Sequence, residues 1–113
     1  MYEETNELPQ DRTPVPVTKE SINQMNQAWN DNDITSQLHQ LISMNDAAGL
    51  AQVFGTQPIY AHLRSKDGRG PMWWAHEHGR KSIVKLLRSK GVSEKRKDKD
   101  GITPLDLSED DEF

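Results

Sequence analysis

The pentapeptide Gly68-Arg69-Gly70-Pro71-Met72 returns 33 positions later as Gly101-Ile102-Thr103-Pro104-Leu105. In this alignment glycine meets glycine, proline meets proline, and an apolar methionine meets leucine. Thr103 followed by Pro104 is typical of a helix start, because the hydroxyl can cap the first turn and proline has no N–H to satisfy there. A spacing of this length is that of a repeat protein, in which stacked helical units bury their apolar faces against each other.

The residues between the two pentapeptides fill in one repeat unit. A helix start at Pro71 is followed by a second apolar run, Ile83-Val84-Lys85-Leu86-Leu87, then by Gly91 and by a loop that ends at Asp100-Gly101. This order resembles the ankyrin repeat, with Thr103-Pro104-Leu105 as its most specific fragment and Gly70-Pro71-Met72 as a looser copy. The resemblance implies an all-α stack of helix-turn-helix repeats. The chain departs from the family pattern where Gly70 replaces threonine and Trp73 replaces the usual histidine.

An earlier repeat is predicted by moving the same alignment back another 33 positions. Leu50, Ala51, Val53 and Phe54 then take the places of the second apolar run, and Leu41-Ile42 take those of Trp74-Ala75. Apolar residues meet at each of these positions, although Leu38 stands where proline is expected. About two and a half repeats are therefore expected, the first of them degenerate.

An additional helix is expected in front of these repeats, over residues 18–30. Thr18 can cap it, and Ile22, Met25 and Trp29 follow one helix face. Because terminal repeats need a capping surface, we expect this helix to shield the end of the stack, with Trp29 as a core anchor. The expected organisation is a flexible segment at 1–17, the extra helix at 18–30, repeats at 34–64 and 65–97, a partial repeat at 98–107 and an acidic tail at 108–113.

Composition favours one small domain. The chain has 113 residues, 33% of them hydrophobic, so little core is shared among the repeats. No apolar run is long enough to span a membrane, and the first residues are acidic where a secretory signal is basic. Cytosol or nucleus is the default location; the endoplasmic reticulum lumen is the alternative if a leader has been removed, because Asp110-Asp111-Glu112-Phe113 distantly resembles a retrieval tetrapeptide.

Charge is divided unequally along the chain. Residues 62–99 hold twelve basic and four acidic side chains, although the whole chain has a net charge of −4. The repeat alignment gathers part of this charge into a basic stripe, which consists of Arg64, Lys81, Lys85, Arg88 and Lys97. Three interpretations stay open: a solvated surface, a contact with the chain's own acidic tail, or an acidic partner such as a protein segment, a phosphoinositide or, least favoured, a nucleic acid.

A catalytic or metal site is not expected. His76 and His78 are two positions apart on a helix and therefore point about 200° from each other, so they cannot bind one ion together. His39 and His62 belong to other segments, and cysteine is absent. No enzyme activity, cofactor or metal is predicted.

The function implied by the resemblance is that of a protein-protein interaction module. Partners of such stacks dock on the concave surface formed by the turn tips and inner helices, and here those positions are Lys66, Asp67, Arg69, Trp73, Glu77, His78, Lys99, Asp100 and Ile102. Trp73 is either an aromatic anchor for a partner or a packing residue against the neighbouring repeat. The partner is expected to be another protein, with an acidic surface as one possibility. Electrostatic binding of a polyanion or an anionic lipid headgroup through the basic stripe is the alternative, and the chain can also be one piece of a larger protein.

Overall fold

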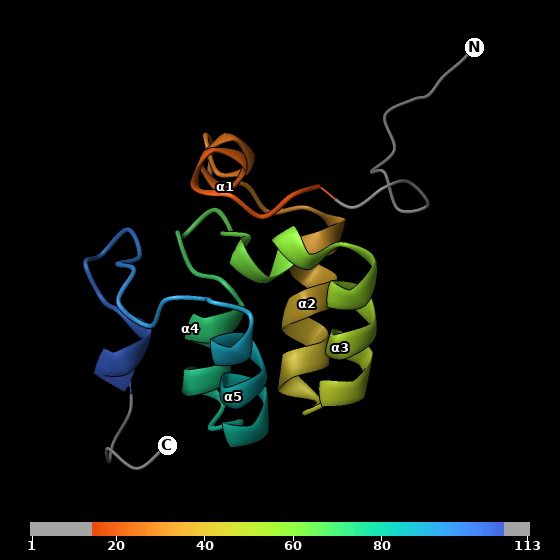
Figure 1. Cartoon of the computed structure of the whole chain (residues 1–113). Helices are drawn as coiled ribbons and strands as arrows, with labels where there is room; N and C mark the ends of the chain where they lie inside the picture. Colours follow the sequence, from red (N-terminus) through yellow and green to blue (C-terminus); the bar gives the residue numbers. More distant parts are fainter. Residues whose placement is uncertain (1–14, 108–113) are drawn as a thin grey trace.

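The computed structural model describes residues 15–107, which form α-helices and short 3₁₀ helices with no strand among them (Figure 1). The all-α expectation is therefore confirmed for this part of the chain. Most of the expected flexible segment, residues 1–14, and the acidic tail at 108–113 lie outside the described residues. The helices are α1 (Lys19–Met25), α2 (Asp33–Ser43), α3 (Ala47–Thr56), η1 (Pro58–His62), α4 (Pro71–Glu77), α5 (Lys81–Ser89) and η2 (Pro104–Leu107).

Two helix pairs stand side by side in the molecule (Figure 1). α2 packs on α3 and α4 packs on α5, while contacts from α2 to α4 and from α3 to α5 join the pairs. η2 lies against the other flank of α4, so α4 is the central element. The core between the pairs is formed by side chains with no exposed surface, among them Leu38, Ile42, Leu50, Phe54, Ile83 and Leu87.

Two loops repeat their backbone hydrogen bonds 33 residues apart. The Ser65 amide donates to the Arg69 carbonyl at 2.7 Å, and the Asp98 amide donates to the Ile102 carbonyl at 2.9 Å. A glycine in the left-handed region closes each turn, with φ of 77° at Gly68 and 81° at Gly101. Such a φ strains any side chain with a Cβ, so the glycine pair in the two pentapeptides serves this turn.

The two helix pairs repeat with a different offset, which corrects the alignment made from sequence. The Asp46 amide donates to the Leu41 carbonyl at 2.8 Å, and the Arg80 amide donates to the Ala75 carbonyl at 2.8 Å, so these equivalent bonds are 34 residues apart. α3 has ten residues where α5 has nine, and the register returns to 33 at the ends of these helices. The predicted pairing of apolar positions was thus one residue out over most of the first pair.

The N-terminal helix is shorter than expected and lies elsewhere. Thr18 caps α1 as predicted, accepting a hydrogen bond from the Ser21 amide, but the helix ends at Met25 rather than at residue 30. Asn26 then bonds to the segment after η1: its Nδ2 donates to the His62 carbonyl at 2.9 Å, and its Oδ1 accepts from the Arg64 amide at 3.0 Å. α1 therefore lies against η1 on the loop side of the molecule (Figure 1).

Trp29 is a half-buried surface contact and not the core anchor that was expected, because it follows the end of α1. Its ring covers Gly68 so closely that a Cβ there would lie 2.5 Å from it. The Arg64 guanidinium stacks on the same ring at 4.4 Å. Trp29 thus fastens the N-terminal segment to the first loop.

The glycine that departs from the family pattern has a steric reason. A Cβ on Gly70 would lie 2.3 Å from the Leu63 carbonyl oxygen, which leaves no room for threonine, and α4 begins at Pro71 without a side-chain cap. Thr103 is not crowded in this way and caps η2 as predicted: its Oγ1 accepts from the Asp106 amide at 3.2 Å. No helix within residues 15–107 has both the length and the apolar character needed to cross a membrane.

Candidate functional site

An open polar groove runs between α2 and α4 beside the loop tips. α2 has two faces: Leu38 and Ile42 are buried in the core, and a polar stripe at i, i+3, i+4 and i+7 faces the groove. The lining residues are Ser36, His39, Gln40 and Ser43 of this stripe, together with Asp31, Thr35, Ser65, Asp67, Arg69, Trp74 and Glu77. Expected partner-binding residues Asp67, Arg69 and Glu77 are therefore brought together here.

Trp74 forms the apolar part of the groove wall. It is 7% exposed, which confirms the prediction that it is buried, and its ring meets that of His39 edge-on at 5.0 Å. Contacts of this geometry are favourable because the positive edge of one ring faces the negative face of the other. The contact fixes the orientation of His39.

Trp73 lies on the opposite flank of α4, which corrects its assignment to the partner-binding surface. It is only 6% exposed, and it lines a small internal cavity with Val92 and Pro104 on the side of η2. The Arg69 guanidinium covers its ring at 4.0 Å. Adjacent helical residues point about 100° apart, and the tryptophan directed toward the groove is Trp74. Of the two alternatives, packing against the next turn is the one that the structure supports.

Asp98 anchors the second loop and was not singled out from the sequence. Its side chain has no exposed surface and accepts hydrogen bonds from the Asp100 and Ile102 amides and from Arg69 Nε, the last at 3.0 Å. Burial acts to raise the pKa of Asp98, but the hydrogen bonds from Ile102, Arg69 and Asp100 outweigh it and hold the pKa below its usual value. Arg69 is thus committed to the loop rather than free for a partner.

The other expected turn-tip residues lie at the surface. Lys66, Lys99, Asp100 and Ile102 are exposed, and Ile102 is one of the few large apolar residues at the surface of the described chain. The two loop tips are side by side, because the Lys99 amide donates to the Asp67 carbonyl at 2.9 Å. Lys99 Nζ also lies 3.4 Å from Asp67 Oδ1.

The basic stripe is less available than the sequence indicated. Arg64 is half-buried and donates to the carbonyls of Gly68 and Lys97, and burial, assisted by the charge of Arg96, lowers its pKa. Arg88 donates through Nε to one oxygen of Glu94 at 2.9 Å and through Nη2 to the other at 3.1 Å. Three members, Lys81, Lys85 and Lys97, keep exposed side chains. The two arginines therefore stabilise the chain itself.

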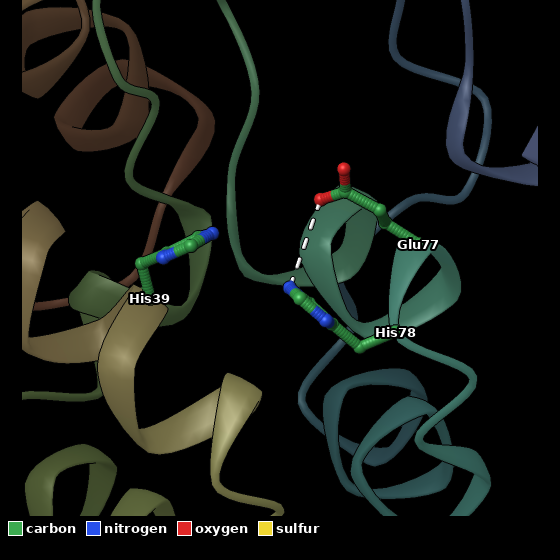
Figure 2. A group of neighbouring side chains, drawn as sticks. All are labelled: His39, Glu77 and His78. Atoms are coloured by element: carbon green, nitrogen blue, oxygen red, sulfur yellow. Dashed lines mark ion pairs between the residues drawn. The ribbon is translucent and has the colours of Figure 1, made fainter.

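The histidines are arranged differently from what their order in the chain suggests. His76 points into the protein, where its Nε2 lies 2.7 Å from Glu94 Oε2, and His78 points to the other side, as the two-residue spacing predicts. His39, which the sequence placed in a separate segment, lies next to His78 with ring centroids 5.6 Å apart. Figure 2 shows His39 on α2 facing Glu77 and His78 at the end of α4.

Several groove residues had a signal in the sequence that was not used. Ser36, His39, Gln40 and Ser43 follow helical spacing and form the polar complement of the apolar stripe on α2. Asp31 gives no such signal, because it reaches the groove only through the loop before α2, where its Oδ1 accepts from the Lys66 amide at 3.0 Å.

Comparison with known protein families identifies no match to this chain, and the same is true of a search of curated protein sequences. The groove and the fold therefore carry the functional argument.

Proposed function

We propose that this chain is an ankyrin-type repeat module that binds a partner protein in the groove between α2 and α4 and along the adjacent loop tips. The observation that carries the proposal is the groove itself: two parallel rows of polar side chains with a tryptophan and a histidine between them, open to solvent along one side. The proposed activity is binding, with no reaction and no cofactor.

The repeated hydrogen bonds support an ankyrin-type arrangement. Equivalent bonds recur at 33 residues in the loops and at 34 in the helix pairs, and the loop tips bond to each other through Lys99 and Asp67. In a stack of this kind the inner helices and the tips of the loops line one concave side. Here those elements are α2, α4 and the loops at 65–69 and 98–102.

The charges of the groove favour a partner segment rich in hydrogen-bond donors. Three carboxylates, Asp31, Asp67 and Glu77, line it, and its one arginine is held by Asp98. Electrostatic complementarity then favours lysine, arginine or amide side chains in the part of the partner that enters the groove. This differs from the acidic partner that the basic stripe suggested.

The experiment uses charge and bulk placed on α2. Ser36→Arg and Gln40→Arg change exposed side chains that line the groove, and both variants are expected to keep the helical circular dichroism spectrum of the native chain. Partners captured by the tagged native chain from lysate are identified by mass spectrometry, and the affinity of each purified partner is then measured. We expect both variants to weaken binding by at least about tenfold, the loss typical of one disrupted central contact.

The matched control is Lys85→Glu, an exposed change on the outer face of α5. A partner that binds both arginine variants normally but loses Lys85→Glu, and that weakens as salt rises, contradicts the groove proposal. That outcome identifies the alternative, electrostatic binding of an acidic protein, polyanion or lipid headgroup by the exposed lysines of the basic stripe.

A further inference from the structure

We propose that His39, Glu77 and His78 bind one divalent transition-metal ion of the zinc class, which bridges α2 and α4. The candidate ligand atoms are one ring nitrogen of each histidine and one carboxylate oxygen of Glu77, and all three lie within 4.8 Å of one another (Figure 2). The inference does not depend on the docking proposal, since it concerns the chain alone.

The distances can close without a change in the backbone. Ligands at 2.0–2.1 Å from a tetrahedral zinc ion are separated from each other by about 3.4 Å. The widest pair must therefore approach by about 1.4 Å, a movement within reach of side-chain rotation. Glu77 and His78 are 45% and 30% exposed, so their side chains have room to rotate.

One atom of the group lacks a hydrogen bond. His78 Nε2 is buried in the protein surface without a hydrogen-bond partner, and the nearest oxygen of Glu77 is 3.8 Å away, too far for a hydrogen bond. A buried polar atom without a partner is uncommon in native proteins, and a bound ion is one of its ordinary explanations. A cation between the imidazole nitrogen and the carboxylate would satisfy both.

His39 is oriented toward the other two ligands. Its ring is held edge-on by Trp74 at 5.0 Å, which limits the loss of side-chain freedom when a metal binds. His39 belongs to α2, whereas Glu77 and His78 end α4. An ion held by all three would join the two walls of the groove.

The donor set selects the class of ion. Two imidazole nitrogens and one carboxylate suit Zn²⁺ and its neighbours Co²⁺, Ni²⁺ and Cu²⁺, whereas Ca²⁺ and Mg²⁺ need ligand sets of oxygen. Three protein ligands leave a fourth tetrahedral position for water or for a donor atom of a partner. That position opens toward the groove.

The test titrates Zn²⁺ into the full chain without a polyhistidine tag, after treatment with a chelator. Calorimetry is expected to give one ion per chain. In nuclear magnetic resonance spectra the ring signals of His39 and His78 should shift together, while those of His62 and His76, which are 5% and 4% exposed, serve as internal controls and stay in place. Co²⁺ should give the strong visible absorption of a tetrahedral site.

Variants distinguish this site from adventitious binding. His39→Gln, Glu77→Gln and His78→Gln are each expected to weaken Zn²⁺ binding by at least about tenfold. Asp67→Asn is the matched control, because it removes a carboxylate from the same groove that is not part of the group. Glu77 is exposed, so loss of binding in Glu77→Gln cannot come from unfolding. An unchanged affinity in the three ligand variants, or the absence of a shift at His39 and His78, overturns the proposal.

Discussion

Asp98 shows how one buried carboxylate organises a loop. It takes two backbone amides and the Arg69 guanidinium, and Arg69 in turn covers Trp73. The turn at 98–102 and the far flank of α4 are therefore joined through a single side chain. A carboxylate without exposed surface is tolerated only when such partners surround it.

Asp98→Asn is expected to lower the free energy of unfolding by about 2 kcal/mol, because the neutral amide accepts weaker hydrogen bonds and leaves the Arg69 charge unpaired. Urea denaturation followed by circular dichroism measures the change. Asp100→Asn is the matched control: this carboxylate is 55% exposed and 3.9 Å from Arg69 Nη2, so its loss should change stability by less than about 0.5 kcal/mol. Equal effects of the two variants would contradict the role assigned to Asp98.

The same pair predicts a pH dependence. The pKa of Asp98 is lowered in the folded protein, while in the unfolded chain an aspartate titrates near about 3.9. The stabilisation is therefore complete above about pH 5 and is lost as the pH falls through 3.9 toward the folded pKa. The difference in unfolding free energy between the native chain and Asp98→Asn should shrink from about pH 6 to about pH 3. A difference that stays constant over this range argues that packing alone is lost.

At the scale of elements, the contact between the two helix pairs depends on Arg80, at the N-terminal end of α5. Its Nε donates to the Ile42 carbonyl at 3.2 Å and its Nη2 to the Ser43 carbonyl at 2.6 Å, which caps the C-terminus of α2. The last carbonyls of a helix have no partner within it and carry partial negative charge, so a guanidinium is favourable there. Arg80 thus ties the second pair to the first.

Arg80→Ala is expected to destabilise the fold by about 1–2 kcal/mol, since two charge-assisted hydrogen bonds are lost. Arg80→Lys should fall between the two, because an ammonium group cannot reproduce the fork of the guanidinium. Hydrogen exchange should quicken at residues 42–46 before it does in the rest of the chain. Lys85→Ala, on the exposed face of α5, is the control and should change stability by less than about 0.5 kcal/mol.

Much of the element order could be predicted from local signals. Thr18 and Thr103 cap helices as their chemistry indicates, and the apolar stripe of α2 is buried. The shift of one residue between α3 and α5 could not be predicted, because both registers place apolar residues opposite each other. The early end of α1 had no local signal strong enough to outweigh the apolar spacing of Trp29; it follows from Asn26, whose amide bonds to residues about forty positions away.

The groove shows the same division. Its α2 side follows helical spacing and was readable, whereas its depth depends on which of two adjacent tryptophans faces α2. Adjacent aromatic residues give no preference by pattern alone, and the choice is made by contacts distant in sequence: Arg69 over Trp73 and His39 against Trp74. The nearness of His39 and His78 is likewise a property of the packing of α2 on α4.

At the scale of the whole molecule, α4 is the common neighbour of α2, α5 and η2, and its two tryptophans pack on opposite flanks. Trp73→Ala and Trp74→Ala are each expected to cost about 3–5 kcal/mol. That is a large part of the stability of a small domain, so both variants approach global unfolding. Replacement by phenylalanine keeps an aromatic ring and should leave each variant folded while weakening one flank.

The two phenylalanine variants are expected to differ in where the protein loosens. Trp73→Phe removes contacts on the side of Val92 and Pro104, so amide exchange should quicken over residues 98–107. Trp74→Phe removes the contact with His39, so exchange should quicken in α2. The native chain supplies the reference rates, and α5, packed behind α4, should change little in either variant. If both variants loosened the same elements to the same extent, the two flanks would be coupled through α4 as one cooperative unit. In an array whose units mainly contact their neighbours, the effects should instead stay local, because each tryptophan joins α4 to a different neighbour.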